Sequence, residues 1–130
     1  MRHQLQWMTL AGLLLAVAPA VARAQETLPA GVTKQMIDEG GKLFKGQGLC
    51  HACHGQDAKG MPGMGANLTD TKWLHSDGSY EGIVKTIMSG VPSDKSSDGS
   101  VMPAKGGSSL SDEQVKAVAA YVWSLSHSGK

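Results

Sequence analysis

The sequence predicts a small all-α domain, and three observations support this fold class. Three segments place apolar residues at helical spacing, each after a residue that caps helices well. The long stretches between them, residues 55–78 and 91–109, contain many Gly, Ser and Pro residues and lack the alternation of a strand. The chain has 130 residues, which suits one hydrophobic core and is short for two.

The first helix is expected to begin after Thr33, and Gly46 and Gly48 end its pattern. The second is expected to begin after Ser79 and to end at Gly90. Their apolar faces consist of Met36, Ile37, Gly40, Leu43 and Phe44 in the first helix, and of Ile83, Val84, Ile87 and Met88 in the second.

The third helix has the strongest start signal. Ser111 and Gln114 form a capping box, and Leu110 can pack against Val115 across the helix start. Its buried stripe is expected to contain Val115, Val118, Ala119, Val122 and Leu125.

Composition limits what this domain can do. Only 5% of the residues are aromatic and 17 are Gly, so side chains alone would build a thin core. Long loops are uncommon in compact domains unless they serve a purpose, and wrapping a large ligand would be one. The chain has 12 basic and 11 acidic residues, so it lacks the basic excess of a nucleic-acid binder. We therefore expect no nucleic-acid partner.

Residues 1–24 have the features of a secretory signal peptide. Arg2 precedes an uncharged run from Leu10 to Ala20, and Ala22-Arg23-Ala24 suits cleavage after Ala24. An uncleaved anchor is the alternative, but the apolar stretch 7–22 contains Pro19 and is shorter than the roughly 20 residues that span a bilayer. We therefore expect a periplasmic protein without a transmembrane segment after cleavage.

The remaining chain divides into three parts. Residues 25–32 are expected to form a flexible lead-in, residues 33–127 the domain itself, and residues 128–130 a short tail.

The motif Cys50-His51-Ala52-Cys53-His54 is the part of the sequence that carries chemistry. Cysteines three positions apart lie on the same side of one helical turn, where each thiol can add to one vinyl group of a haem. His54 would then lie beneath the iron. Thioether bonds retain the cofactor in an exported protein that could otherwise lose it, so the motif and the signal peptide support each other.

Two other interpretations of the motif remain open at this point. A redox-active dithiol would follow a strand in an alternating strand and helix pattern, whereas a Gly-rich helix end precedes Cys50. A zinc site would normally take its second ligand pair from farther along the chain than His51 and His54. We favour one covalently attached haem c.

The chain resembles the class I monohaem c-type cytochromes, whose haem lies between a His and a Met. It is similar in particular to the small haem-c modules of bacterial haem-copper oxidases and dehydrogenases. The matching stretches are residues 40–44, 50–55, 67–70, 101–104 and 118–125. The resemblance implies the small cytochrome c fold, with three main helices and long loops wrapped around one haem.

The resemblance also implies supporting roles for individual residues. Gly40 and Phe44 would pack against Tyr121 of the last helix, and the carbonyl of Ala66 would accept the Nδ1 hydrogen of His54. Relatives usually have Pro in place of Ala66. Trp73 would either donate its indole hydrogen to a haem propionate or simply pack against the haem.

The second axial ligand must come from chain that has crossed to the other face of the haem. Met102 is 48 residues beyond His54, lies in a loop and precedes Pro103, which matches the Met-Pro of the family. His75 is the main alternative. The other candidates were Met36, Met61, Met64, Met88, His51 and His127, each of which has a simpler role in packing, in a loop or in the tail.

A Met and a His that both ligate the haem iron leave it no open coordination position and raise its reduction potential. Such a site is typical of an electron carrier rather than an enzyme. The expected function is one-electron transfer in the periplasm between redox proteins, from a dehydrogenase or cytochrome complex to an acceptor such as an oxidase. Two alternatives are an electron-entry subunit of an oxidase or dehydrogenase complex, and a ligand-binding haem enzyme or sensor in which Met102 is labile.

Overall fold

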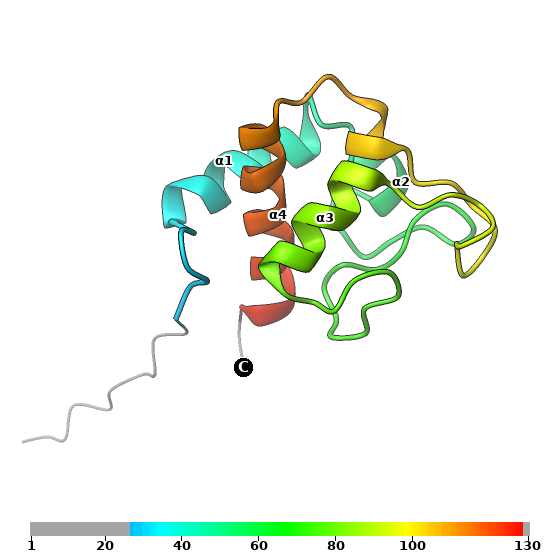
Figure 1. The fold of residues 1–130 in the computed structure, drawn as a ribbon, viewed down its shortest axis with the longest axis horizontal. Coiled ribbons are helices and arrows are strands. Elements are labelled where there is room, and N and C mark those ends of the chain that lie inside the picture. Colours follow the sequence, from blue (N-terminus) through cyan, green and yellow to red (C-terminus); the bar gives the residue numbers. More distant parts are fainter. Residues whose placement is uncertain (1–26, 129–130) are drawn as a thin grey trace, which may run out of the picture.

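The computed structural model describes residues 27–128, so the predicted signal peptide lies outside the described residues. The described chain is helical, with two isolated β-bridges between Met61 and Gly65 and between Val91 and Met102. The elements in chain order are α1 (Lys34–Lys45), α2 (His51–His54), α3 (Tyr80–Ser89), the 3-10 helix η1 (Ala104–Gly107) and α4 (Asp112–His127). The longer helices pack together, and the long loops gather at one end of the molecule (Figure 1).

The helix starts predicted from capping residues are confirmed. Thr33 Oγ1 accepts the backbone N–H of Met36 at 3.1 Å, and Ser79 Oγ accepts that of Gly82 at 3.0 Å. Ser111 and Gln114 form the full capping box, with distances of 3.2 and 2.9 Å. The predicted ends are also confirmed, because α1 is followed by Gly46 and α3 by Gly90.

The helix η1 was not predicted, because a segment of four residues is too short for a periodic pattern. Lys105 and Gly106 have positive φ angles of 54° and 67°, so the turn departs from regular helix. Lys105 connects η1 to the start of α4, because its Nζ donates to the carbonyl of Leu110 at 3.0 Å and to Asp112 at 2.8 Å.

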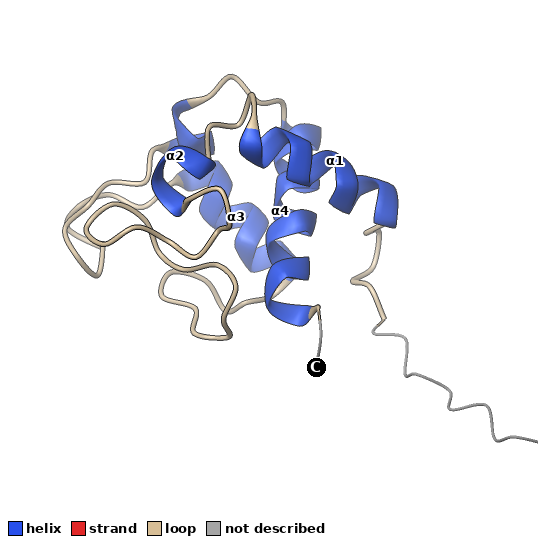
Figure 2. Ribbon diagram, turned by 180° about the vertical axis from the view of Figure 1, so that it is seen from behind, coloured by secondary structure: helices blue, strands red, loops and turns tan. Residues whose placement is uncertain are grey.

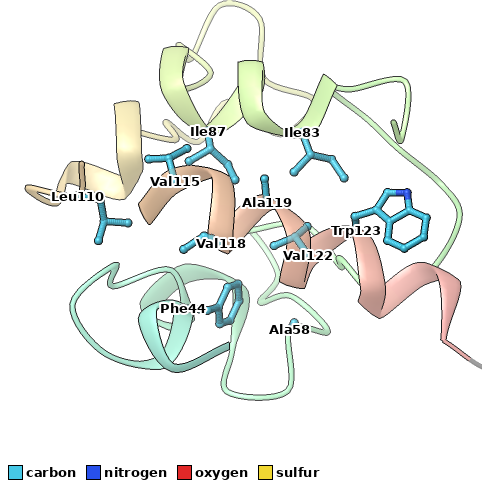
Figure 3. Packing of buried hydrophobic residues seen from close by; sticks show 10 residues of the cluster. All are labelled: Phe44, Ala58, Ile83, Ile87, Leu110, Val115, Val118, Ala119, Val122 and Trp123. Atoms are coloured by element: carbon cyan, nitrogen blue, oxygen red, sulfur yellow. The ribbon is translucent and has the colours of Figure 1, made fainter. Parts of the chain in front are cut away.

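The helix α4 lies between α1 and α3, and the core forms on both of its sides (Figure 3). This arrangement extends the predicted stripe: Ala117 and Ala120 are buried as well, whereas Leu125 is only partly buried. The largest fully buried side chains are Phe44, Val115 and Val118.

Contact between α1 and α4 is close at Gly40. A Cβ atom there would overlap the carbonyl of Ala117 and lie 2.9 Å from the Cβ of Tyr121. One turn later Phe44 contacts Tyr121, with ring centroids 5.4 Å apart and planes tilted by 59°. The packing of Gly40 and Phe44 against Tyr121 is thus present, and Gly40 is required because only hydrogen fits between the helices.

Replacing Gly40 with Ala is expected to destabilise the domain by about 1–3 kcal/mol, because the added methyl group must push α1 away from the α4 backbone. Gly41→Ala is the matched control on the same helix, since its Cβ would meet only the Tyr121 ring, at 3.2 Å. Chemical denaturation of both variants measures the difference. Equal stability of the two variants would contradict this account of the helix contact.

Candidate functional site

A cavity of about 180 Å³ lies at the loop end of the molecule. Its lining combines the Cys-His motif in and before α2, the loop that follows it, one face of α3 and the segment around Met102. The core helices contribute Phe44, Val118 and Val122. The long loops that surround this region gather on the side of the molecule where α2 lies (Figure 2). Segments distant in sequence therefore meet around one space.

The helix α2 brings both cysteines of the motif to this cavity. Cys50 Sγ donates to the carbonyl of Gly48 at 3.4 Å. Burial raises the pKa of the Cys50 thiol to about 11, so this sulfur is uncharged at neutral pH. A thiolate ligand would be disfavoured here, whereas a thioether, which carries no charge, suits the environment.

His54 has its ring fixed by a backbone acceptor. Its Nδ1 lies 2.8 Å from the carbonyl oxygen of Ala66, which can only accept, so Nδ1 carries the hydrogen. The loop returns to α2 through a bond from Gly60 N–H to the carbonyl of His54, at 2.8 Å. With the hydrogen on Nδ1, Nε2 is the ring nitrogen that can bind a metal.

Met102 is placed by the end of α3. Val91 and Met102 exchange two backbone hydrogen bonds of 2.8 and 2.9 Å, which form an antiparallel bridge. Just before the bridge, a Cβ atom at Gly90 would overlap the carbonyl of Met102 and lie 2.7 Å from the N of Ala104. The Met102 backbone is therefore held against the last residue of the α3 cap, and Met102 lines the cavity.

The structure brings most of the predicted site residues together, with one exception. Trp73 lines the cavity and is half-buried, and Phe44 lines it from α1. Tyr121 is not part of the lining and reaches the cavity only through its contact with Phe44.

Among the alternative ligand candidates, His75 and Met64 line the cavity. The others point elsewhere: His51 Nδ1 lies 3.2 Å from the carbonyl of Phe44, His127 stacks on Trp123, and Met88 packs against the core. Met36 and Met61 do not line the cavity.

Sequence reasoning missed the polar part of the lining. Lys72 and a set of residues from the segment before Met102, namely Ser96, Ser97, Asp98 and Ser100, face the cavity. The one signal for them is the length and polarity of the stretch 93–100, a composition that is also typical of a solvated loop.

These residues fit a haem attached through two thioethers. Two cysteine sulfurs and an imidazole whose Nδ1 faces a carbonyl oxygen come from α2 and its N-cap, and a thioether side chain comes from a distant segment. Within residues 27–128, no three side chains of the types His, Cys, Asp and Glu converge into a possible metal cluster. The zinc interpretation thus finds no third ligand among these residues.

The fold and the site together define a c-type cytochrome domain with the small cytochrome c fold. A family model described as cytochrome c oxidase, cbb3-type, subunit III matches residues 35–122, and the chain belongs to this family. Membership identifies the cofactor of the domain as covalently bound haem c.

Curated relatives carry matching segments. The cbb3-type cytochrome c oxidase subunit CcoP of Rubrivivax gelatinosus is 46% identical over 79 residues, which cover 60% of this chain and 23% of that protein. Subunit FixP of Bradyrhizobium sp. (strain ORS 278) is 41% identical over 109 residues, covering 81% of this chain and 33% of that protein. The chain thus spans 23% and 33% of the length of these two relatives.

The fold has a counterpart among solved structures. Cytochrome cL from Methylophaga aminisulfidivorans MPT superposes with a TM-score of 0.53 and 24% identity, over 70% of this chain and 53% of that one. In the part of this chain that the structure describes, none of the helices has the length and apolar character needed to cross a membrane.

Gly90→Ala is expected to destabilise the domain more than Gly99→Ala. Both residues have positive φ, 69° and 78°, so each substitution costs about 1–2 kcal/mol in backbone strain. Only at Gly90 would the methyl group also collide with the Met102 backbone, which adds about 1–3 kcal/mol, whereas nothing lies within 4 Å at Gly99. Thermal unfolding of the haem-loaded variants measures both. A smaller loss for Gly90→Ala would show that the contact with Met102 is not tight.

Proposed function

We propose that the domain carries single electrons through a haem c that is bound by Cys50 and Cys53 and ligated axially by His54 and Met102. When bound, the haem iron supplies one redox step between its ferrous and ferric states. The protein holds the group, sets its potential and leaves no open coordination position. The observation that carries the proposal is the convergence of a CxxCH helix and a Met from a distant segment on one cavity.

The hydrogen bond from His54 to Ala66 supports His54 as one axial ligand. It fixes the tautomer and the orientation of the ring, as outer partners of metal-bound histidines do. The Ala66 carbonyl is part of a loop whose end is bonded back to the start, since the N–H of Leu68 donates to the carbonyl of Ala58 at 2.8 Å. A loop closed in this way keeps the acceptor in place without the Pro that relatives usually have.

Met102 is favoured over Met64 and His75, the two other candidate ligands that line the cavity. Met64 follows His54 by only ten residues in the loop on the same side, and it is 47% exposed. His75 belongs to the loop before α3, which Thr86 Oγ1 holds by a 2.9 Å bond to the carbonyl of His75. Met102 is half-buried and is fixed by the bridge to Val91, and Pro103 stiffens the chain after it.

A second candidate function is that of an electron-entry subunit in an oxidase complex. The names of the relatives favour it, because they are subunits of cbb3-type cytochrome c oxidases. The same site would serve both functions, since electron transfer through a complex needs the same coordinated haem. Donor and acceptor redox proteins are the proposed partners in either case.

The export signal in residues 1–24 supports a periplasmic location for the domain. The attachment of haem through CxxCH in an exported chain fits this location, because a covalent cofactor is retained there. We propose cleavage after Ala24.

Met102→Ala, in protein matured with haem, is expected to abolish the Met-to-iron charge-transfer band and to lower the midpoint potential, because a potential-raising ligand is lost. The reduced variant should also bind carbon monoxide at its open position. Met64→Ala is the matched control and should keep the band. Survival of the band in Met102→Ala would overturn the ligand assignment, and tight carbon monoxide binding by the unmodified protein would favour the sensor alternative.

Fractionation of a host that expresses the full chain tests location and the form in which the domain acts. We expect a haem-stained protein that begins at Gln25, leaves the cell with the soluble periplasmic fraction and elutes as a monomer. N-terminal sequencing and size-exclusion chromatography measure these properties. Recovery only with the membrane and with oxidase subunits would instead support the second candidate function.

A further inference from the structure

Residues 92–101 form a closed loop, and the haem-attachment motif does not explain its role. Its two ends are tied together by the bridge between Val91 and Met102. Both ribbon views show it beside the loop that follows α2, at the end of the molecule where the cavity lies (Figures 1 and 2). Four of its polar residues line the cavity. The loop therefore adds polar groups to a site whose other walls are largely apolar.

Asp98 is the acidic residue of this lining, and its carboxylate is held by its neighbours. Oδ1 accepts the hydroxyl of Ser100 at 2.5 Å, the N–H of Ser100 at 3.0 Å and the hydroxyl of Ser96 at 2.8 Å. These hydrogen bonds, those from Ser100 first, lower the pKa of Asp98 to about 2. The group is consequently a negative charge throughout the physiological pH range, and bonds within its exposed loop orient the carboxylate.

Charged and titratable groups that share the cavity with Asp98 are few. Lys72 is the basic side chain of the lining, and it comes from the loop before α3. The imidazoles of His54 and His75 and the sulfurs of Cys50 and Cys53 complete the set among the described residues. Asp94 and Lys95 belong to the same loop but do not line the cavity. Of the charged residues on the loop, Asp98 is thus the one that lines the cavity.

We propose that Asp98 is a potential-determining residue, which stabilises the ferric state of the haem relative to the ferrous state through its fixed negative charge at the cavity. The inference rests on the proposed electron-transfer function. On reduction the iron gains one electron, and Asp98 neither takes up nor releases a proton, because it stays ionised in both states. A negative charge close to the iron opposes the arriving electron and lowers the midpoint potential.

Asp98→Asn keeps the size of the side chain and an acceptor oxygen for Ser100 while it removes the charge. We expect it to favour reduction by about twofold to fivefold, given the separations and dielectric of a protein surface. A tenfold change in this equilibrium corresponds to about 59 mV for one electron. Spectroelectrochemical titration of the holoprotein at pH 7 and low salt measures the shift.

Four further measurements distinguish an effect of the Asp98 charge from an effect of altered loop structure. Asp98→Glu, which restores the charge, should return the potential toward that of the unmodified protein. Asp94→Asn, the matched control in the same loop, should shift the potential much less. The effect of Asp98→Asn should shrink at high salt, because an exposed charge is screened, and should stay constant between pH 5 and 8, where Asp98 is ionised.

The proposal is overturned if Asp98→Asn shifts the potential no more than Asp94→Asn, or shifts it downward. It is also overturned if the variant loses the Met-to-iron band, because the effect would then arise from displacement of the loop. Failure of the underlying function would be recognised separately, since the unmodified protein would then lack covalent haem or that band.

Discussion

The close packing of α1 on α4 is the contact on which the rest of the structure depends. Because Gly40 has no side chain, α1 lies directly against the backbone of Ala117, and Phe44 is brought between Tyr121 and the cavity. The turn after α1 is short and bonded back to it, with Gly48 N–H donating to the carbonyl of Leu43 at 2.8 Å. The position of the motif helix α2 therefore follows from the position of α1.

Hydrogen bonds that involve backbone groups hold both sides of the haem cavity. One side is closed by the bond between His54 and Ala66, and the other by the bridge between Val91 and Met102. Loops of this length bury few apolar contacts of their own, so a bound haem supplies much of the apolar surface they enclose. Stability of the domain and retention of the cofactor are thereby linked, as for any ligand that binds only the folded chain.

The buried part of the site disfavours charged groups, whereas its solvent-exposed edge carries a charged one. Burial raises the pKa of the free Cys50 thiol, which haem attachment converts to an uncharged thioether, whereas hydroxyl and backbone donors keep the exposed Asp98 carboxylate ionised. These opposite effects arise from the same principle, because each group adopts the protonation state that its surroundings solvate better. Electron transfer benefits from this division, since a rigid and weakly polar interior reorganises little when the iron changes charge.

Much of this protein was predictable from local sequence. Thr33, Ser79 and the pair Ser111 and Gln114 mark helix starts because capping is a contact within four residues, and the CxxCH motif identifies the cofactor because its geometry fits into one helical turn. Tertiary structure alone decided which side chains share the cavity. The exclusion of Tyr121, the burial of α4 on two sides, the helix η1 and the approach of Asp98 all depend on contacts between segments far apart in the chain. Such contacts leave no periodic or short-range pattern, because they are set by how helices and loops pack in three dimensions.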